Sequence, residues 1–588
     1  MKNITFLLLF IVSTITSQQK KKLQNDDEVL KYKLIPQETL FLHYNNTLLF
    51  SGENLHYKIY CFNSEDNAYT NISKVAYVVL LNEDEQYIFK HRIQLNDGIG
   101  YGDFFIPVSV PSGNYKIVAY TQWMLNAKNH FYQGELSIIN PYQVNENIIA
   151  KNGILPNTNT GEQGDTKVYT SDDKIRLSFD KTAYACREKV TLTLENQFED
   201  YEGSYSISVI RKDTFVKSTD LSAIDFVKNK DEQIVLKKDV NVNSSVFLPE
   251  MRGELVYGKI KAKEDKKVSL KKDLGLSLPK EKNEVYFVST DDAGEFVLNL
   301  PNRNTDNDKL LVEVLGEDRS DYTVSLYDIP KIDFNNLNFY QFKITSGLKD
   351  KIIQRSVYNQ IENNYYGAKP DTLITKEQSA PFYGKYDIYT YKLDEYTRFP
   401  TIKETLVEVV EGMWSTKDEN GKYIFGIRDY YPDQEEIGYK PLLLIDGVVE
   451  QDQDKIINSA AKDFVSISYI RDRYYLGSKI FGGIVLMETK NNDYAETRVA
   501  EYIATADLPE IKVQNKKYFK QKYNGEKLYD RIPDYRNQLL WEPEITFETK
   551  KKIIRFFTSD IKGEFEVRLE GFNSLGVPVS VKKSFLVD

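Results

Sequence analysis

Apolar and polar residues alternate along much of the first quarter of the chain. Residues 115–119 carry an apolar side chain at every second position, as do residues 87–93 except at His91, and turn residues such as the Asn-Asp-Gly at 96–98 bound these stretches. Alternation with period two between turns is typical of antiparallel strands with one buried face. We therefore predict an antiparallel β-sandwich over residues 35–142.

A polar segment separates this predicted sandwich from a partial copy of itself. Residues 143–173 are rich in Asn, Thr, Gly and Asp and have neither helical nor strand periodicity, which predicts a linker. Beyond it, residues 182–194 align without gaps to residues 47–59, with Thr, Glu and the inward apolar residues at matching positions. An internal repeat of this kind predicts a second, related β-sandwich, to which we assign residues 174–248.

Three further regions of the chain carry weaker patterns. Residues 249–328 alternate around an Asp/Gly turn at 291–294 and predict another β-sandwich. Residues 329–394 are mixed in character and rich in Tyr, and we expect a helix around 349–363 within them. Residues 495–588 alternate about a Gly turn and predict a closing β-sandwich.

Residues 395–492 have a different, α/β pattern. Thr401 opens a capping box ahead of apolar residues at helical spacing, and a buried strand at 442–445 runs into the turn Asp446-Gly447. We interpret Asp446 as a turn residue and not as a functional carboxylate. The chain is thus predicted to be mainly β, with tandem β-sandwiches and one small α/β domain.

These patterns resemble known modules. The strand, the turn ending in Glu and the alternating strand at 47–59 and 182–194 resemble the opening of macroglobulin-like (MG2-type) domains, and residues 252–298 are similar to carboxypeptidase regulatory-like sandwiches. The series of strands and turns over 395–492 resembles the plug domain of TonB-dependent outer-membrane receptors. The ordered combination resembles a family of exported Bacteroidota proteins that carry MG2 and plug domains.

The resemblance to a receptor plug implies a folded α/β module and not a transporter. Only residues 491–588 follow the plug-like region, and we expect them to be too few to build the barrel that such a plug closes. The resemblance to the exported family implies no enzymatic activity and no cofactor. A plug-like domain without its barrel is therefore expected to act as an interaction module.

The composition of the chain limits the compartments in which it can act and the partners that it can bind. Residues 1–17 have the charged start, apolar run and small polar end of a cleavable secretory signal, and no later stretch is apolar enough for a membrane-spanning helix. A formal net charge of −10 argues against nucleic acid as a partner. The chain has two cysteines, and the sequence leaves open whether Cys61 and Cys186 form a disulfide.

The sequence offers few residues for catalysis. A thioester needs a Cys beside a Gln, and the nearest string, at 160–164, has no cysteine. The four histidines, at spacings unlike a zinc motif, are expected at the surface of strands or loops. We therefore assign no catalytic, cofactor-binding or metal-binding residue. The histidines are His43, His56, His91 and His130.

These observations lead to one favoured hypothesis and two alternatives. We expect a non-enzymatic binding or scaffolding protein of the cell envelope, in the periplasm, at the outer membrane or at the cell surface. Its expected partner is a protein, in particular an outer-membrane β-barrel complex. The alternatives are a surface-exposed adhesin or stalk and an exported hydrolase with its site at a domain junction.

Overall fold

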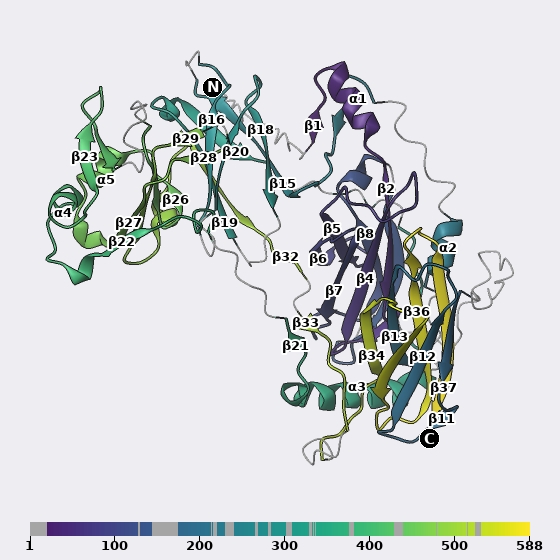
Figure 1. Cartoon of the computed structure of the whole chain (residues 1–588). Helices are drawn as coiled ribbons and strands as arrows, with labels where there is room; N and C mark the ends of the chain where they lie inside the picture. The colour runs from purple at the N-terminus through teal and green to yellow at the C-terminus, as the bar shows by residue number, and fades with distance from the viewer. Residues whose placement is uncertain are drawn as a thin grey trace, which may run out of the picture.

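The protein is mainly β, as predicted. Figure 1 shows two lobes: one holds β2 to β13 with β34 to β37, and the other holds β16 to β20 with β22 to β30. The computed structural model describes residues 20–127, 130–143, 174–212, 215, 220–229, 240–264, 268–279, 284–301, 308–327, 332, 334, 337–374, 381–428, 439–477, 479–513, 516–523 and 531–588.

Sandwich 1 lies within the range 35–142 predicted from the sequence. Its two sheets have the strand orders β2-β4-β7 and β3-β9-β8-β5-β6, and they enclose a core that includes Leu55, Tyr57 and Ile117. All pairs are antiparallel except β3 with β9. The strands are β2 (Glu38–Tyr44), β3 (Leu48–Phe50), β4 (Asn54–Asn63), β5 (Val75–Leu81), β6 (Tyr87–Gln94), β7 (Ile99–Phe105), β8 (Gly113–Tyr120) and β9 (Tyr132–Ile139).

Sandwich 2 corrects the predicted domain boundaries, because it is built from two distant segments of the chain. Its sheets have the orders β10-β12-β35 and β11-β37-β36-β13-β34, so strands from 175–211 pair with strands from 538–587. The separate sandwiches predicted over 174–248 and 495–588 are therefore one. The strands are β10 (Ile175–Phe179), β11 (Ala183–Tyr184), β12 (Lys189–Asn196), β13 (Gly203–Arg211), β34 (Gln538–Ile545), β35 (Lys551–Phe557), β36 (Gly563–Asn573) and β37 (Pro578–Val587).

Two other described segments of the predicted range 174–248 also belong elsewhere. The helix α2 (Ala223–Lys228) packs its Ala223 and Phe226 against the core of sandwich 1. The strand β14 (Ser245–Val246) pairs with β1 (Lys21–Lys22), next to the helix α1 (Asp26–Leu34). Neither segment contributes a strand to sandwich 2.

Sandwich 3 occupies the predicted range 249–328 and gains one strand from much later in the chain. Its sheets have the orders β18-β15-β20 and β17-β16-β19-β31, where β31 comes from the segment predicted to form the closing sandwich. The strands are β15 (Gly253–Ala262), β16 (Asp273–Leu278), β17 (Glu284–Ser289), β18 (Glu295–Pro301), β19 (Asp308–Val314), β20 (Tyr322–Leu326) and β31 (Ile503–Leu508).

The α/β module follows the order of elements expected for 395–492. Its sheet has the order β22-β27-β30-β25-β26, and Thr401 accepts a hydrogen bond from the backbone N–H of Glu404, as a helix N-cap does. Its elements are β22 (Tyr389–Lys392), α4 (Ile402–Glu408), β23 (Met413–Lys417), β24 (Tyr423–Ile427), β25 (Leu442–Ile445), β26 (Val448–Val449), α5 (Gln453–Ile457), β27 (Phe464–Ile470), β28 (Tyr474–Leu476), β29 (Lys479–Phe481), β30 (Ile484–Thr489) and α6 (Tyr494–Thr497).

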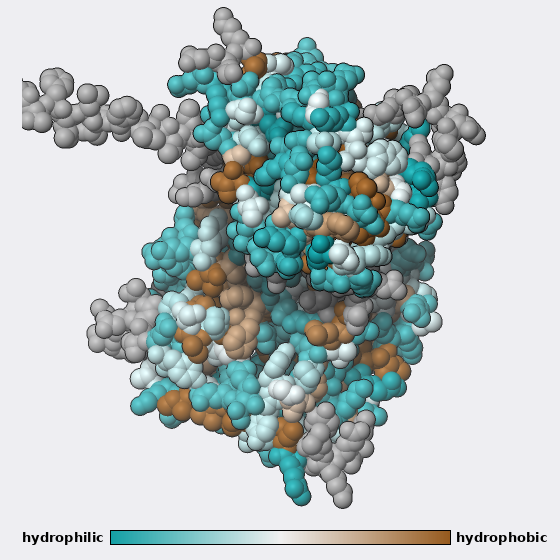
Figure 2. All heavy atoms as spheres, turned by 90° about the vertical axis from the view of Figure 1, so that its left-hand side faces the viewer, coloured by the Kyte–Doolittle hydropathy of each residue, from teal (hydrophilic) through white to brown (hydrophobic). Residues whose placement is uncertain are grey.

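Figure 2 looks onto the lobe that contains this module. Its surface is mainly hydrophilic, and the hydrophobic side chains on it form separate patches instead of one continuous area. An apolar interface of the kind that obligate partners share is therefore not apparent on this face.

The connector between sandwich 3 and the α/β module returns to the first lobe. The helix predicted around 349–363 is α3 (Lys349–Asn364), and Figure 1 places it along the lower end of sandwiches 1 and 2. The Arg355 guanidinium donates to both carboxylate oxygens of Glu53, at 2.8 and 2.7 Å, and both side chains are largely buried. This bidentate pair fixes α3 to sandwich 1.

The last part of the chain crosses back from the second lobe to the first. After β31, the strand β32 (Ile511–Lys512) adds in parallel to β6 of sandwich 1, and β33 (Lys516–Lys517) pairs with β21 (Thr372–Leu373), which follows α3. Only then does the chain complete sandwich 2. The fold is therefore nested, with sandwich 3 and the α/β module inserted between the two halves of sandwich 2.

Candidate functional site

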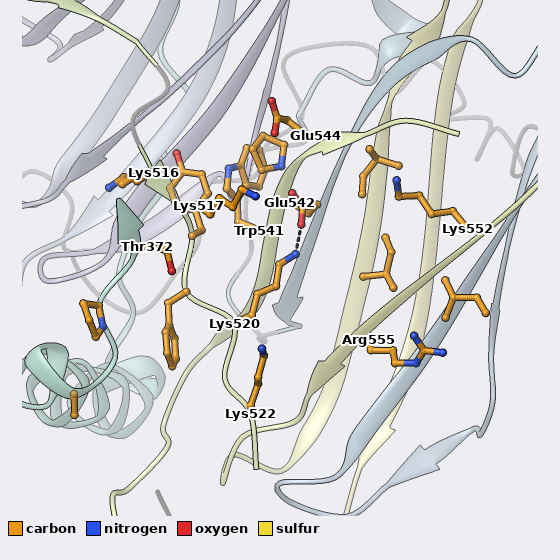
Figure 3. A pocket seen from close by; sticks show the side chains of 18 residues that line it. Thr372, Lys516, Lys517, Lys520, Lys522, Trp541, Glu542, Glu544, Lys552 and Arg555 are labelled. Carbon is orange, nitrogen blue, oxygen red and sulfur yellow. Dashed lines mark hydrogen bonds and ion pairs between the residues drawn. The ribbon is translucent and has the colours of Figure 1, made fainter. Parts of the chain in front are cut away.

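A groove of about 960 Å³ lies on the open side of sandwich 2. One wall is the strap, defined as residues 516–523, together with residues just after α3; the other wall is β34 and β35. Figure 3 shows the labelled side chains of both walls around the space between them. The charged lining residues are Lys516, Lys517, Lys520, Lys522, Lys552, Arg555, Glu542 and Glu544.

The lining of the groove is basic although the chain is acidic. The lining contains six cationic side chains and two carboxylates, whereas the whole chain has a formal net charge of −10. Concentrating one sign of charge in a concave surface raises the local potential and attracts groups of the opposite sign. The groove is therefore suited to an anionic occupant.

Two of the lysines hold the strap in place. The Lys516 ammonium lies 2.8 Å from Asp103 of sandwich 1 and 3.2 Å from Asp371. Burial opposes the charge of Lys516, but these two carboxylates outweigh it and raise its pKa. Lys520 forms an ion pair with Glu542 of β34 across the groove, drawn as a dashed line in Figure 3. The strap is therefore joined to β34 across the groove by Lys520 and to sandwich 1 by Lys516.

Three other cations are available to an occupant. Within the described part of the chain, the side chains of Lys517, Lys522 and Arg555 form no ion pair, and all three residues are exposed. Ile553, also in the lining, is 49% exposed and adds an apolar contact. The groove therefore combines free positive charge with some apolar surface.

An aromatic cluster forms the back of the groove. Trp541 is 3% exposed, and the His56 ring stacks on it with ring centroids 5.8 Å apart. Tyr518 of the strap meets His56 edge to face at 4.6 Å. Burial lowers the pKa of His56 to about 4, so its ring is neutral at neutral pH and acts as an aromatic spacer.

A buried lysine fixes sandwich 2 against sandwich 1 behind this cluster. The Lys58 ammonium donates to Ser204 Oγ at 2.7 Å, to the Tyr205 carbonyl at 3.1 Å and to the Pro543 carbonyl at 2.6 Å. Burial lowers its pKa to about 7. Since Pro543 belongs to β34, this contact sets the position of one groove wall.

The prediction that the histidines lie at the surface is wrong. His43 is fully buried, with its Nδ1 2.6 Å from Ser206 Oγ of sandwich 2, and His130 is 7% exposed. Burial lowers the pKa of His91 to about 3. His43 and His130 are buried, and His56 and His91 are half-buried, because other parts of the chain cover the outer faces of sandwich 1, which alternation in one strand does not reveal.

The interpretation of Asp446-Gly447 as a turn is confirmed. Both residues have positive φ, 48° and 78°, between β25 and β26. The Asp446 carboxylate accepts hydrogen bonds from the backbone N–H groups of Thr489, at 2.8 Å, and Tyr494, at 3.2 Å. Its role is to tie the turn to the end of β30.

The cysteines do not form a disulfide. Cys61 is buried in sandwich 1 and Cys186 is partly exposed in sandwich 2, and the two are not bonded to each other. Among the described residues, no group of three or more His, Cys, Asp or Glu side chains is arranged to hold a metal ion. None of the helices in the described ranges is long and apolar enough to cross a membrane.

Some predicted features lie outside the described residues. They are the signal sequence at 1–17, nearly all of the linker at 143–173 and the string at 160–164. The groove itself was not predicted, because its lysines belong to the strap and to β35, whose proximity depends on the fold. The closest signal in the sequence is the density of lysine in the strap.

Comparisons with known proteins give distant structural neighbours. No family model matches the chain, and no curated protein matches it. Salmonella α2-macroglobulin reacted with methylamine is 9% identical, with a TM-score of 0.23, over 97% of this chain and 41% of that one. Escherichia coli α2-macroglobulin activated by porcine elastase is 9% identical, with a TM-score of 0.24, over 94% and 44%.

A bacterial adhesin is also among the neighbours. The Yersinia pseudotuberculosis adhesin InvE is 7% identical, with a TM-score of 0.13, over 49% of this chain and 58% of that one. The chain spans less than half the length of the α2-macroglobulins it matches. At this level of similarity the comparisons carry no inference about function.

Proposed function

We propose that this chain is an exported, non-enzymatic scaffold that binds a protein partner in the groove, as an accessory component of an outer-membrane complex. The observation that supports this most directly is the groove itself: an open, basic surface in an acidic chain, lined by three cations that form no ion pair with any described residue. The signal-like sequence at 1–17 supports export. The resemblance of the α/β module to a receptor plug supports an outer-membrane location.

The walls of the groove are pre-arranged for binding. The strap is fixed by Lys516 to Asp103 and Asp371, and β34 is fixed by Lys58. A preformed surface loses less conformational entropy when a partner binds than a surface that must first become ordered. The groove can therefore bind through charge and shape with little rearrangement.

The chemistry of the lining supports binding and not catalysis. The described residues that line the groove include Lys, Arg, Glu, Thr and aromatic side chains but no Ser, Cys or His that could pair as nucleophile and base. The partly buried carboxylate of Glu542 is engaged by Lys520. We propose on this basis that the groove holds a partner without transforming it.

The test is recovery of a partner through the groove. A photo-crosslinking amino acid at Phe519, in the full chain expressed in its own host, should capture an outer-membrane protein after gentle detergent extraction. The triple variant Lys517→Gln, Lys522→Gln, Arg555→Gln should abolish the crosslink. A matched triple variant of exposed lysines outside the groove, Lys189→Gln, Lys462→Gln, Lys562→Gln, should keep it.

Other outcomes would favour the alternatives. Recovery of the chain alone from the soluble periplasm, without any crosslinked protein, would refute the proposed complex. Labelling of the chain on intact cells with no membrane partner would favour an adhesin or stalk. Turnover by the native chain in broad peptide and glycan activity profiling, lost in the groove variant, would favour a hydrolase.

A further inference from the structure

The strand β35 borders the groove with one of its edges open. It is the last strand of the sheet β10-β12-β35 and pairs with β12 alone. At its two ends, the Lys550 carbonyl accepts from the N–H of Asn196, and the N–H of Thr558 donates to the Glu188 carbonyl. Because bonding alternates along an antiparallel strand, the even-numbered residues bond to β12 and the odd-numbered ones face the groove side.

Two residues in the middle of β35 present unused backbone groups at this edge. The outward carbonyl of Lys551 accepts from Thr549, and that of Phe557 accepts from Arg536. Between them, the outward N–H and C=O groups of Ile553 and Arg555 have no partner within the described part of the chain. An open edge of this kind is a template for pairing with another extended chain.

The charges beside this edge select the chemistry of the incoming chain. Arg555 itself, Lys552 three residues before it on β35 and Lys522 on the facing strap all line the groove that the edge borders, as Figure 3 shows. An added strand would lie about 4.8 Å from β35, within the space between β35 and the strap. Acidic side chains on that strand would meet these cations, whereas basic ones would be repelled.

We propose that the occupant of the groove is an acidic, extended segment of the partner protein, which joins sandwich 2 as an additional strand at the edge of β35. This inference rests on the proposed partner-binding function and specifies the recognition. Backbone hydrogen bonds to Ile553 and Arg555 supply part of the affinity, and the lysines supply the selection for acidic sequence. A folded helix would leave the backbone groups of β35 unpaired.

The test separates backbone pairing from charge. The probe is a capped nine-residue peptide of alternating Glu and Val, labelled with fluorescein, and its binding to the full mature chain is followed by fluorescence anisotropy. Ile553→Pro removes the outward N–H without removing a bond to β12, a position at which an edge strand tolerates proline. Ile553→Thr is the matched control, because it shortens the side chain but keeps the N–H and the β-branch.

Strand addition predicts that the two variants differ. Ile553→Pro should weaken peptide binding about three- to tenfold relative to Ile553→Thr, the effect of one backbone hydrogen bond. Lys522→Gln with Arg555→Gln should weaken it further and reduce its salt dependence, whereas Lys189→Gln with Lys562→Gln should not. A fully N-methylated peptide, which has the same charge but no backbone donors, should bind the native chain at least tenfold more weakly; this arm holds even if the proline variant misfolds.

The remaining outcomes overturn the inference in distinguishable ways. Equal binding of the normal and N-methylated peptides would show that charge alone holds the probe, and strand addition would be wrong while the groove remained a binding site. Tighter binding of polygalacturonate than of the peptide would identify an anionic glycan instead. Absence of peptide binding with the Phe519 crosslink intact would refute this inference alone, and absence of both would refute the proposed function as well.

Discussion

Because sandwich 2 is built from two distant segments, we predict that a destabilising substitution in the last segment of the chain also destabilises a segment more than three hundred residues earlier. Leu569 of β36 is fully buried, lies opposite Ile207 of β13 and opposite Val581 of β37, and shares one core with both. Leu569→Ala deletes apolar volume from this core. We expect the change to destabilise strands of both segments together.

The magnitude follows from the burial. Replacing a fully buried Leu with Ala costs about 2–5 kcal/mol, from lost burial and the cavity that remains. If the two segments form one cooperative unit, the population of its open state rises by a factor of roughly 30 to 5,000. Of the buried residues in this core, nine come from 175–209 and fourteen from 539–587, so neither segment has a core without the other.

Hydrogen exchange measured by mass spectrometry on the full chain reads out this coupling. Amides of β12 and β13 should exchange faster in Leu569→Ala by the same factor as those of β36. The matched control is Leu443→Ala in β25, a residue that is 1% exposed and belongs to the core of the α/β module. It should accelerate exchange in that module only. Faster exchange at 563–587 with unchanged exchange at 189–211 would refute the single sandwich.

Three further predictions concern other parts of the molecule. Arg355→Ala should release α3, because it leaves the buried Glu53 carboxylate uncompensated at a cost of about 3–5 kcal/mol, and exchange across 349–364 would report it; a helix as protected as in the native chain would contradict the role of the pair. His91 is neutral in the folded state down to a pKa of about 3 but binds a proton at about pH 6.5 when unfolded, so stability is lost as the pH falls below 6.5, by up to about 1.4 kcal/mol per pH unit. Urea unfolding of His91→Gln at pH 7 and pH 5 should show a smaller loss than the native chain, and an identical loss would refute this. Cys186 should react with a maleimide in the native protein and Cys61 only after unfolding, as followed by mass spectrometry; resistance of both until a reductant is added would indicate a disulfide.

Local elements of the fold could be predicted because their causes are local. The helix expected around 349–363 is α3, the N-cap expected at Thr401 is formed, and the turn at Asp446-Gly447 has the positive φ values that this pair permits. Each depends on residues within a few positions of one another. Apolar periodicity, capping and turn preference therefore carry this information directly.

The pairing of distant strands could not be predicted in the same way. Alternation in β12 shows that Val190 and Leu192 face a core, but a strand with this pattern fits any sheet that offers a complementary face. The strand that pairs with it in the sheet, β35, begins only at Lys551. In β2, the polar residue His43 is expected at the surface from the sequence, but in the fold Ser206 of sandwich 2 lies against it. The sequence does not show which outer faces of the sandwiches are covered by other parts of the chain.

The groove forms only because these distant strands pair. Its walls are β34 and β35, which acquire their positions only when they join β13 and β12, and the strap, which precedes them in the chain. Lys516 reaches Asp103 and Asp371 only after β32 and β33 have returned to the first lobe. A chain that has not completed sandwich 2 therefore has no groove. Binding of a partner at the edge of β35 would stabilise the closed, nested state and no other, so partner affinity and the stability of sandwich 2 should rise and fall together.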